Sequence, residues 1–414
     1  MRRRPFFGWW VVITGFIDQF TAAGFGVYAF SVLVKPMSDD PDLGWSRTEL
    51  VWGITIGIVI ATSTGPLFGF FLDRRHGPRL LMLIFGLMGA VGLVFTSRVE
   101  HLWQYYLFFG VVSAFFLHTT IFLVVPTVVS KWFVRKRGQA LIFSTMGRPA
   151  SGLVMLPLTQ VLMSAVGWRT TWLVLGIAVA AIVIPLNALF LHRRPEDRGL
   201  LPDGAAESPR IRDSSAPRES SWTLGLALRT RAFWLVLLAT NLSGSGIIGV
   251  LVNQVAYLKE FYSDAGAVGG ATLVTASSLV GRFAWLLIAD RVNPRHSAAL
   301  SFLLSAAGML FFIYADGVVM MVLWGLSFGV GIGGMDPMTS LVWASFFGRR
   351  FLGSIRGFVT MTNMVSIAGS PLLVAAIFEA TGTYRPAFIV LLAAFLSAAV
   401  FILASRAPRA PLRS

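Results

Sequence analysis

Apolar stretches of about twenty residues or more recur along the whole chain, and short polar segments separate them. Each stretch is long enough to cross a hydrocarbon core of about 30 Å as an α-helix. The pattern therefore predicts an all-α polytopic membrane protein with twelve transmembrane helices. The predicted spans are 9–34, 48–72, 79–97, 102–130, 138–164, 169–191, 231–258, 267–289, 297–314, 318–345, 354–379 and 386–405.

The composition agrees with this prediction. Of the 414 residues, 56% are hydrophobic and 13% are charged, which is about half the charge of an ordinary soluble domain. The first apolar stretch is not expected to be a cleaved signal peptide, because it is too long and no small-residue cleavage site follows it. The chain has no cysteine, which excludes disulfides and thiolate metal sites. We expect no bound metal and no cofactor.

Lysine and arginine are distributed unevenly between the two sides of the predicted bundle. Of the 34 basic residues, 26 lie at the termini, in alternate loops and between the sixth and seventh spans, whereas six lie on the opposite side. By the positive-inside rule both termini are expected to be cytoplasmic, in a membrane taken to be a bacterial inner membrane. The net charge of +15 therefore reflects topology and does not indicate nucleic-acid binding.

The two halves of the chain repeat each other. Residues 1–192 and 230–414 are predicted to form two six-helix bundles, and 193–229, rich in Arg, Pro, Ser, Asp and Gly, is predicted to be a cytoplasmic linker. The Asp73-Arg74 pair after the second span matches an Asp-Arg pair after the eighth, about 216 residues later. Such a duplication is typical of transporters whose halves move around a site near the membrane midplane.

The segment Gly69–Arg79, with the sequence GFFLDRRHGPR, resembles the loop between the second and third helices of the major facilitator superfamily. The resemblance covers essentially the whole chain and implies two pseudo-repeated six-helix bundles. In that family the carboxylate caps a neighbouring helix and helps to hold the outward-facing state. By this resemblance Asp73 and Arg74 are expected to be gating residues, with Asp290 and Arg291 as a weaker second copy. The alternative is that these charges only set the orientation of the helices.

Three stretches resemble the monocarboxylate transporters and the related oxalate/formate antiporter-like group: GWWVVITGF at 8–16, GVYAFSVLVKPM at 26–37 with GWSRTEL at 44–50, and GRFAWLLIADR at 281–291. In that group an arginine of the eighth helix binds the substrate carboxylate, and Arg282 falls at that position. Proton-coupled animal members carry an aspartate one helical turn earlier, where this chain has Ser278. Their lysine of the first helix would fall near Val27 or Tyr28. The resemblance therefore implies the carboxylate anchor without two of the usual proton-coupling residues.

Two arginines, Arg148 and Arg282, lie within predicted spans and away from their ends. An unpaired cation at the depth of Arg282 costs on the order of 3 kcal/mol, and its planar guanidinium offers a donor fork that suits a carboxylate. Arg282 is therefore expected either to bind the substrate anion or to form a permanent salt bridge with an acid on another span. Arg148, which precedes Pro149, has three interpretations: a second anion ligand, a side chain that reaches toward the cytoplasm, or a member of an ion pair.

Asp18 in the first span and Asp336 in the tenth are the acidic residues expected to lie deep in the bundle. Each is a candidate to neutralise an arginine or to carry a coupling proton, because burial and a nearby cation act on a carboxyl group in opposite directions. We favour a pairing role for one of them and a proton role for at most one. The sequence does not pair either of them with Arg148 or Arg282.

Other polar residues within spans are candidate secondary ligands. His118 in the fourth span is suited to donate a hydrogen bond to a carboxylate or to titrate near neutral pH, although a buried histidine commonly makes a helix–helix contact. The remaining candidates lie on spans that line the cavity in this fold, and they are Tyr28, Asn241, Tyr257 and Asn363.

The sequence contains no phosphate-binding P-loop, no HExxH metal motif and no Ser-His-Asp grouping in an exposed loop, so an enzyme is not predicted. The leading hypothesis is a secondary active transporter of small organic anions, in particular monocarboxylates, that works by alternating access as a symporter or an antiporter. Its expected partners are the organic anion, protons and the lipid bilayer, and the chain is expected to act as a monomer. The alternative is a proton-coupled exporter of amphiphilic small molecules or drugs, in which Arg282 forms a structural ion pair.

Overall fold

The structure, a computed structural model, describes residues 6–204, 222–314 and 317–408, without the side chains of 264, 265, 365 and 367. Part of the predicted linker, residues 205–221, lies outside the described residues, as do the basic residues 2–4 at the amino terminus and the last part of the basic tail.

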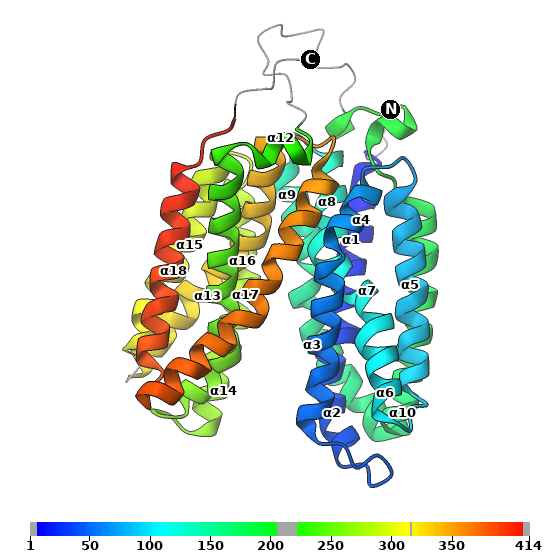
Figure 1. The fold of residues 1–414 in the computed structure, drawn as a ribbon, viewed down its shortest axis with the longest axis vertical. Helices are drawn as coiled ribbons and strands as arrows, with labels where there is room; N and C mark the ends of the chain where they lie inside the picture. Colours follow the sequence, from blue (N-terminus) through cyan, green and yellow to red (C-terminus); the bar gives the residue numbers. More distant parts are fainter. Residues whose placement is uncertain (1–5, 205–221, 315–316, 409–414) are drawn as a thin grey trace, which may run out of the picture. The chain divides into compact units, whose positions relative to one another are not determined.

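Every regular element in the described ranges is helical (Figure 1). The elements up to residue 204 are α1 Gly8–Ala22, η1 Ala23–Tyr28, α2 Ala29–Ser38, α3 Arg47–Ser63, α4 Gly65–Leu72, α5 Gly77–Thr96, α6 Leu102–Tyr105, η2 Tyr106–Val112, α7 Ser113–Thr119, η3 Thr120–Val124, α8 Val125–Trp132, α9 Arg137–Thr145, α10 Gly147–Phe190, η4 Pro195–Arg198 and η5 Pro202–Gly204. The later elements are α12 Leu224–Leu228, α13 Arg231–Leu258, α14 Asp264–Ile288, α15 Pro294–Ile313, α16 Val318–Phe347, α17 Leu352–Thr381 and α18 Arg385–Ala404.

The described helices account for twelve membrane crossings. Ten helical stretches are long and apolar enough to span a membrane, and α3 with α4, bent by 51° at their junction, form an eleventh. The stretch Arg137–Phe190 has 54 residues, which is twice the length that one crossing needs. It breaks at Gly167, whose φ of +78° lies in the left-handed region that glycine adopts without strain. This stretch therefore holds two crossings, and the prediction of twelve spans is confirmed.

The chain divides into two compact units. The first contains Met1–Arg218 together with Arg350–Met361, and the second contains Glu219–Arg349 together with Thr362–Ser414. The start of α17 therefore belongs to the first unit and the rest of that helix to the second. In the first unit α10 packs against α1 and α5, and in the second α16 packs against α14 and α15. The domain boundaries at 192 and 230 stay a prediction.

Candidate functional site

Arg282 lies in α14 of the second unit, and only 5% of it is exposed. The helix that carries it is pressed against the glycine-rich α16, because a Cβ atom at Gly281 would lie 2.8 Å from the Cα of Val330. Trp285 adds a hydrogen bond from its indole N–H to the carbonyl of Val330, at 2.8 Å. These contacts fix the position of α14, and with it Arg282, against α16.

The two asparagines of the second unit differ in their surroundings. The amide of Asn241, on α13, donates to the carbonyl of Leu237 and to the hydroxyl of Thr362, and its Oδ1 accepts from Ser366. It therefore ties α13 to α17. Asn363, also on α17, has a buried Oδ1 with no hydrogen-bond partner in the described part of the chain. Of the two, Asn363 is the one whose side chain has a hydrogen bond left to make.

Tyr257 is completely buried in an aromatic cluster at the end of α13. Its hydroxyl donates to the carbonyl of Ile313 at 2.9 Å, and the rings of Phe312 and Phe388 lie edge-on to it at 4.9 Å. A tyrosine surrounded in this way joins α13, α15 and α18. Its placement suits the packing of these three helices, and a role in substrate binding stays a prediction.

The remaining candidates of the second unit lie at different depths. Asp336 is half-buried in α16, whereas Asp290 and Arg291 are exposed in the turn that follows α14.

Asp18 lies in α1 of the first unit and is completely buried. Its Oδ1 accepts a hydrogen bond of 2.8 Å from the amide of Asn187 on α10, and its Oδ2 has no partner in the described residues. Asn187 was missed in the sequence because a single amide in a long apolar span gives no signal of its partner. The described residues hold no ion pair with Asp18. Because an ionised carboxylate needs a cation or several donors at this depth, the arrangement fits a carboxyl that carries its proton.

Arg148 and Tyr28 lie on neighbouring helices of the first unit, α10 and η1, and both are half-buried. The ring of Tyr28 covers Gly152, one turn beyond Arg148, where a Cβ atom would lie 2.8 Å from the ring. The preceding Gly147 allows α10 to touch α1, because a Cβ atom there would overlap the carbonyl of Phe16. Gly147 and Gly152 thus allow α1 and η1 to pack closely against α10 on both sides of Arg148.

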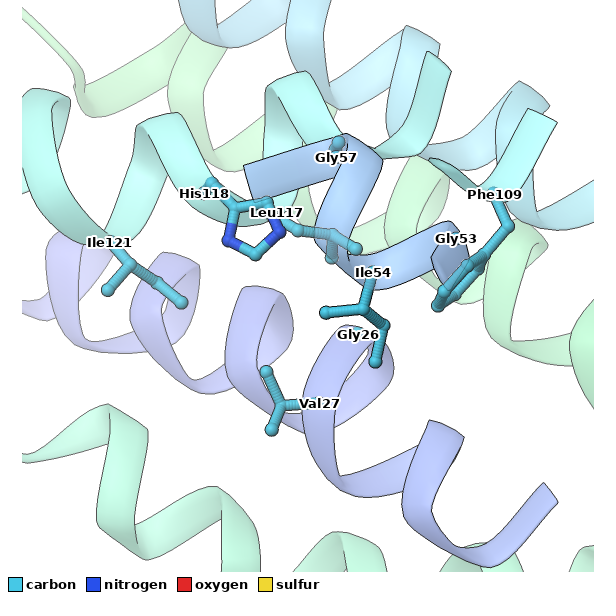
Figure 2. Close-up of a pocket in the computed structure, with 10 residues that line it drawn as sticks. Gly26, Val27, Gly53, Ile54, Gly57, Phe109, Leu117, His118 and Ile121 are labelled. Atoms are coloured by element: carbon cyan, nitrogen blue, oxygen red, sulfur yellow. The ribbon is translucent and has the colours of Figure 1, made fainter. Parts of the chain in front are cut away.

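His118 lies at a small pocket of about 20 Å³ within the first unit (Figure 2). The imidazole is 8% exposed, and the other side chains that line the pocket are apolar. Neither ring nitrogen of His118 has a hydrogen-bond partner in the part of the chain that the structure describes. The lining residues are Gly26, Val27, Gly53, Ile54, Gly57, Phe109, Ala114, Leu117, His118 and Ile121.

Asp73 caps the start of α17 within the first unit. Its Oδ1 accepts from the backbone N–H of Gly353 at 3.0 Å, and its Oδ2 accepts from the N–H and the hydroxyl of Ser354 at 2.8 and 2.7 Å. A carboxylate at this position pairs with N–H groups that have no partner within the helix and faces the positive end of its dipole. The structure thus contains the cap that the family resemblance implied, while the gating role stays a prediction.

Lys131, at the end of α8, completes the surroundings of Asp73. Its Nζ donates to Oδ1 of Asp73 at 2.6 Å and to the carbonyl of Leu72 at 3.1 Å. Only 2% of the lysine side chain and 8% of the aspartate side chain are exposed. The sequence places Lys131 among the basic residues of a loop, so this buried pair was missed. Arg74 points elsewhere, because its guanidinium lies over the ring of Phe70.

The first residues of the predicted linker are bound to the same end of the first unit. Arg193 donates to the carbonyl of Asp73 at 2.8 Å and holds the carboxylate of Asp197 with two hydrogen bonds. Burial raises the pKa of Asp197, but the neighbouring arginines outweigh it and lower this pKa below its ordinary value. The carboxylate of Asp203 accepts from the backbone N–H groups of residues 134–136 at 2.9 to 3.2 Å. This part of the linker is therefore an ordered strap.

Comparison with known proteins places these observations in a family. Residues 19–269 match the Major Facilitator Superfamily. The chain is 27% identical to Monocarboxylate transporter 11 of Homo sapiens, over 83% of this chain and 72% of that protein. It is also 27% identical to Monocarboxylate transporter 4 of Rattus norvegicus, over 97% of this chain and 84% of that protein.

Solved structures with the same fold include two other transporters. The human organic anion transporter MFSD10 has a TM-score of 0.69 at 13% identity, over 95% of this chain and 98% of that chain. The proton:xylose symporter XylE has a TM-score of 0.74 at 12% identity, over 96% of this chain and 95% of that chain. At such identities the likeness concerns the fold alone, and it confirms the predicted fold class.

Proposed function

The chain belongs to the major facilitator superfamily, and on that premise we propose that it is a secondary active transporter of small organic anions, in particular monocarboxylates. It is an integral multi-pass membrane protein, and its relatives are transporters and not enzymes, as the sequence predicted. Beyond family membership, we propose that the substrate is a small organic anion, that transport occurs by alternating access, and that specific residues bind the substrate. We further propose that the chain acts as a monomer in a bacterial inner membrane, with both termini in the cytoplasm.

The burial of Arg282 in α14 carries the proposal. The residue is 5% exposed in a helix that is long and apolar enough to cross a membrane, and a cation at such a depth is a functional-site candidate. A guanidinium binds a carboxylate through two parallel N–H donors. The similarity to proteins named monocarboxylate transporters supports the same assignment. Arg282 is therefore proposed as the ligand of the substrate carboxylate.

The other candidates divide by their surroundings. Asn363 and His118 each have a buried polar group that a substrate can satisfy, and with Arg148 and Tyr28 they are proposed as secondary ligands. Tyr257 and Asn241 already make the hydrogen bonds that join helices, so we assign them to packing.

Proton coupling is proposed at Asp18. Its carboxyl group is completely buried, and the donor that faces it is the neutral amide of Asn187, so the protonated form is favoured until the surroundings change. Asp336, which is half-buried, is the alternative carrier. The Asp73 cap of α17 is proposed to stabilise one state of the transport cycle, with Asp290 and Arg291 as a weaker second copy.

Uptake into proteoliposomes tests the assignment. Labelled mono- and dicarboxylates are offered to the wild type, Arg282→Ala and Arg282→Lys, with and without a pH gradient. Arg231, exposed at the start of α13, provides the matched control Arg231→Ala. We expect Arg282→Ala to lose at least about 2 kcal/mol of binding, or more than tenfold in affinity, because a charge-assisted pair is lost. Arg282→Lys should rescue only part of it, because lysine lacks the planar fork.

Full anion uptake by Arg282→Ala would refute the role of Arg282 as the anchor. If the wild type transports no carboxylate but expels amphiphilic dyes, the protein is instead a proton-coupled exporter, and Arg282 has a structural role.

A further inference from the structure

Asn187 of α10 and Asp18 of α1 form a pair of polar side chains inside the first unit, and both are completely buried. The amide Nδ2 of Asn187 donates to Oδ1 of Asp18 at 2.8 Å and to the carbonyl of Val183 at 2.9 Å. Because only the nitrogen of an amide donates, these two acceptors fix the orientation of the Asn187 side chain. Its oxygen is therefore the atom left to accept a hydrogen bond.

One oxygen of each group remains without a partner. Oδ2 of Asp18 and Oδ1 of Asn187 are buried and make no hydrogen bond in the described part of the chain. Buried polar atoms nearly always have a partner, and two acceptors cannot bond to each other. A proton on Oδ2 of Asp18 turns this oxygen into a donor. The carboxyl group and the amide then each offer the other one donor and one acceptor, which is enough for two hydrogen bonds.

Other side chains near α1 do not supply the missing donor. The hydroxyl of Thr14, one turn before Asp18, is buried and likewise has no partner among the described residues. The charged or titratable side chains on the elements packed against α1 make no hydrogen bond or ion pair with Asp18 in the described ranges. They are Tyr28 of η1, His118 of α7, Lys131 of α8, Arg137 of α9, and Arg148 and Arg169 of α10.

We propose that Asn187 positions the coupling proton on Asp18. In the protonated state Oδ2 of Asp18 donates to Oδ1 of Asn187, while Nδ2 of Asn187 donates to Oδ1 of Asp18. The inference rests on the proposed role of Asp18 and adds the residue that holds its proton. Loss of the proton removes one of the two hydrogen bonds and leaves two oxygen atoms without a donor between them. The contact between α1 and α10 is therefore tighter when Asp18 is protonated.

Substitution of Asp18 by asparagine imitates the protonated state, because an amide N–H replaces the acid O–H and both hydrogen bonds can form. Leucine forms neither of them. Proteoliposomes that contain the carboxylate best transported by the wild type are used to measure its exchange against the labelled acid. Exchange by the wild type should slow as the pH rises, whereas exchange by Asp18→Asn should not depend on pH. Asp18→Leu should exchange at least about tenfold more slowly than Asp18→Asn, because it leaves a buried oxygen of Asn187 unpaired.

Infrared difference spectra of the purified protein between acidic and alkaline buffer test the pair without transport. The wild type should show the C=O band of a protonated carboxyl that Asp18→Asn lacks. In Asn187→Leu this band should move to higher frequency, because the carboxyl loses both of its hydrogen bonds, and Asn187→Gln should reverse part of the shift. Thr171→Val is the control, because Thr171 is also buried on α10 but bonds to the carbonyl of Gly167 in its own helix; it should leave the band in place.

The role of Asn187 is overturned if Asn187→Leu leaves the band of Asp18 unshifted, if the wild type shows no such band, or if Asp18→Asn and Asp18→Leu exchange at the same rate. A wild type that transports no carboxylate overturns the proposed function instead, and the shift of the band in Asn187→Leu then still decides whether the acid and the amide are paired.

Discussion

Loss of the Asp73 carboxylate should destabilise the first unit more than the loss of both Asp73 and Lys131. The two side chains form a buried pair at 2.6 Å, with exposures of 8% and 2%. In Asp73→Asn the ammonium of Lys131 stays buried and loses the carboxylate it faces. In Asp73→Asn/Lys131→Met this uncompensated charge is also removed, and the methionine keeps most of the apolar volume of the lysine stem.

The expected loss of unfolding free energy follows from the burial of the Asp73–Lys131 pair. Removal of one member of a buried ion pair costs about 3–5 kcal/mol, because the remaining charge is not solvated. Lys131→Met alone should cost less, on the order of 1–3 kcal/mol, because Asp73 still accepts three hydrogen bonds from Gly353 and Ser354. The double variant should therefore be more stable than Asp73→Asn, which requires a coupling energy larger than the cost of Lys131→Met alone, on the order of 1–3 kcal/mol.

Reversible unfolding in mixed micelles, followed by far-UV circular dichroism while the fraction of denaturing detergent rises, gives the free energies of unfolding of the four proteins. Arg74→Gln is the control, because Arg74 is exposed next to Asp73 and should change the stability by less than about 0.5 kcal/mol. A double variant as unstable as the sum of the two single variants would show that the pair is not coupled, and the argument from burial would fail.

Three further outcomes are expected. Asp203→Asn should weaken the attachment of the strap to residues 134–136 by about 1.4 kcal/mol. Trypsin should therefore cut the strap about tenfold faster than in the wild type. Equal cleavage rates would show that the contact of Asp203 does not hold the strap. Asp18→Asn keeps an acceptor for Asn187 and should fold but lose the pH dependence of uptake; an unchanged pH profile removes Asp18 as the proton carrier. Gly147→Ala should lower the melting temperature because the new methyl group overlaps α1, whereas Gly269→Ala, with no atom within 4 Å, should not.

Much of the architecture follows from the sequence because each crossing is decided locally. A stretch of twenty apolar residues enters the bilayer as a helix whatever its neighbours are, since its backbone must satisfy its own hydrogen bonds there. The break at Gly167 is also local, because glycine adopts the φ of +78° without strain. Asp73 was likewise identified as a helix-capping carboxylate from its own segment, Gly69–Arg79, which resembles a known loop of the family.

The side chains that contact Asp73 and Asp18 could not be predicted from the sequence. Lys131 is 58 residues from Asp73, and Asn187 is 169 residues from Asp18. A lysine at a helix end looks the same in sequence whether it faces solvent or a buried carboxylate. The pocket at His118 also depends on where the π-helical turns fall in separate helices, and neither hydropathy nor spacing records that.

The sequence by itself determined the twelve crossings, the repeat and the arginine within the eighth span, because membrane insertion depends on the free energy of each segment alone. Only the tertiary structure decided that Asp18 faces an amide, that Lys131 is buried against Asp73, and that Tyr257 packs while His118 lines a pocket. Those outcomes depend on the side chains that other helices bring to the same place, and no segment encodes its neighbours.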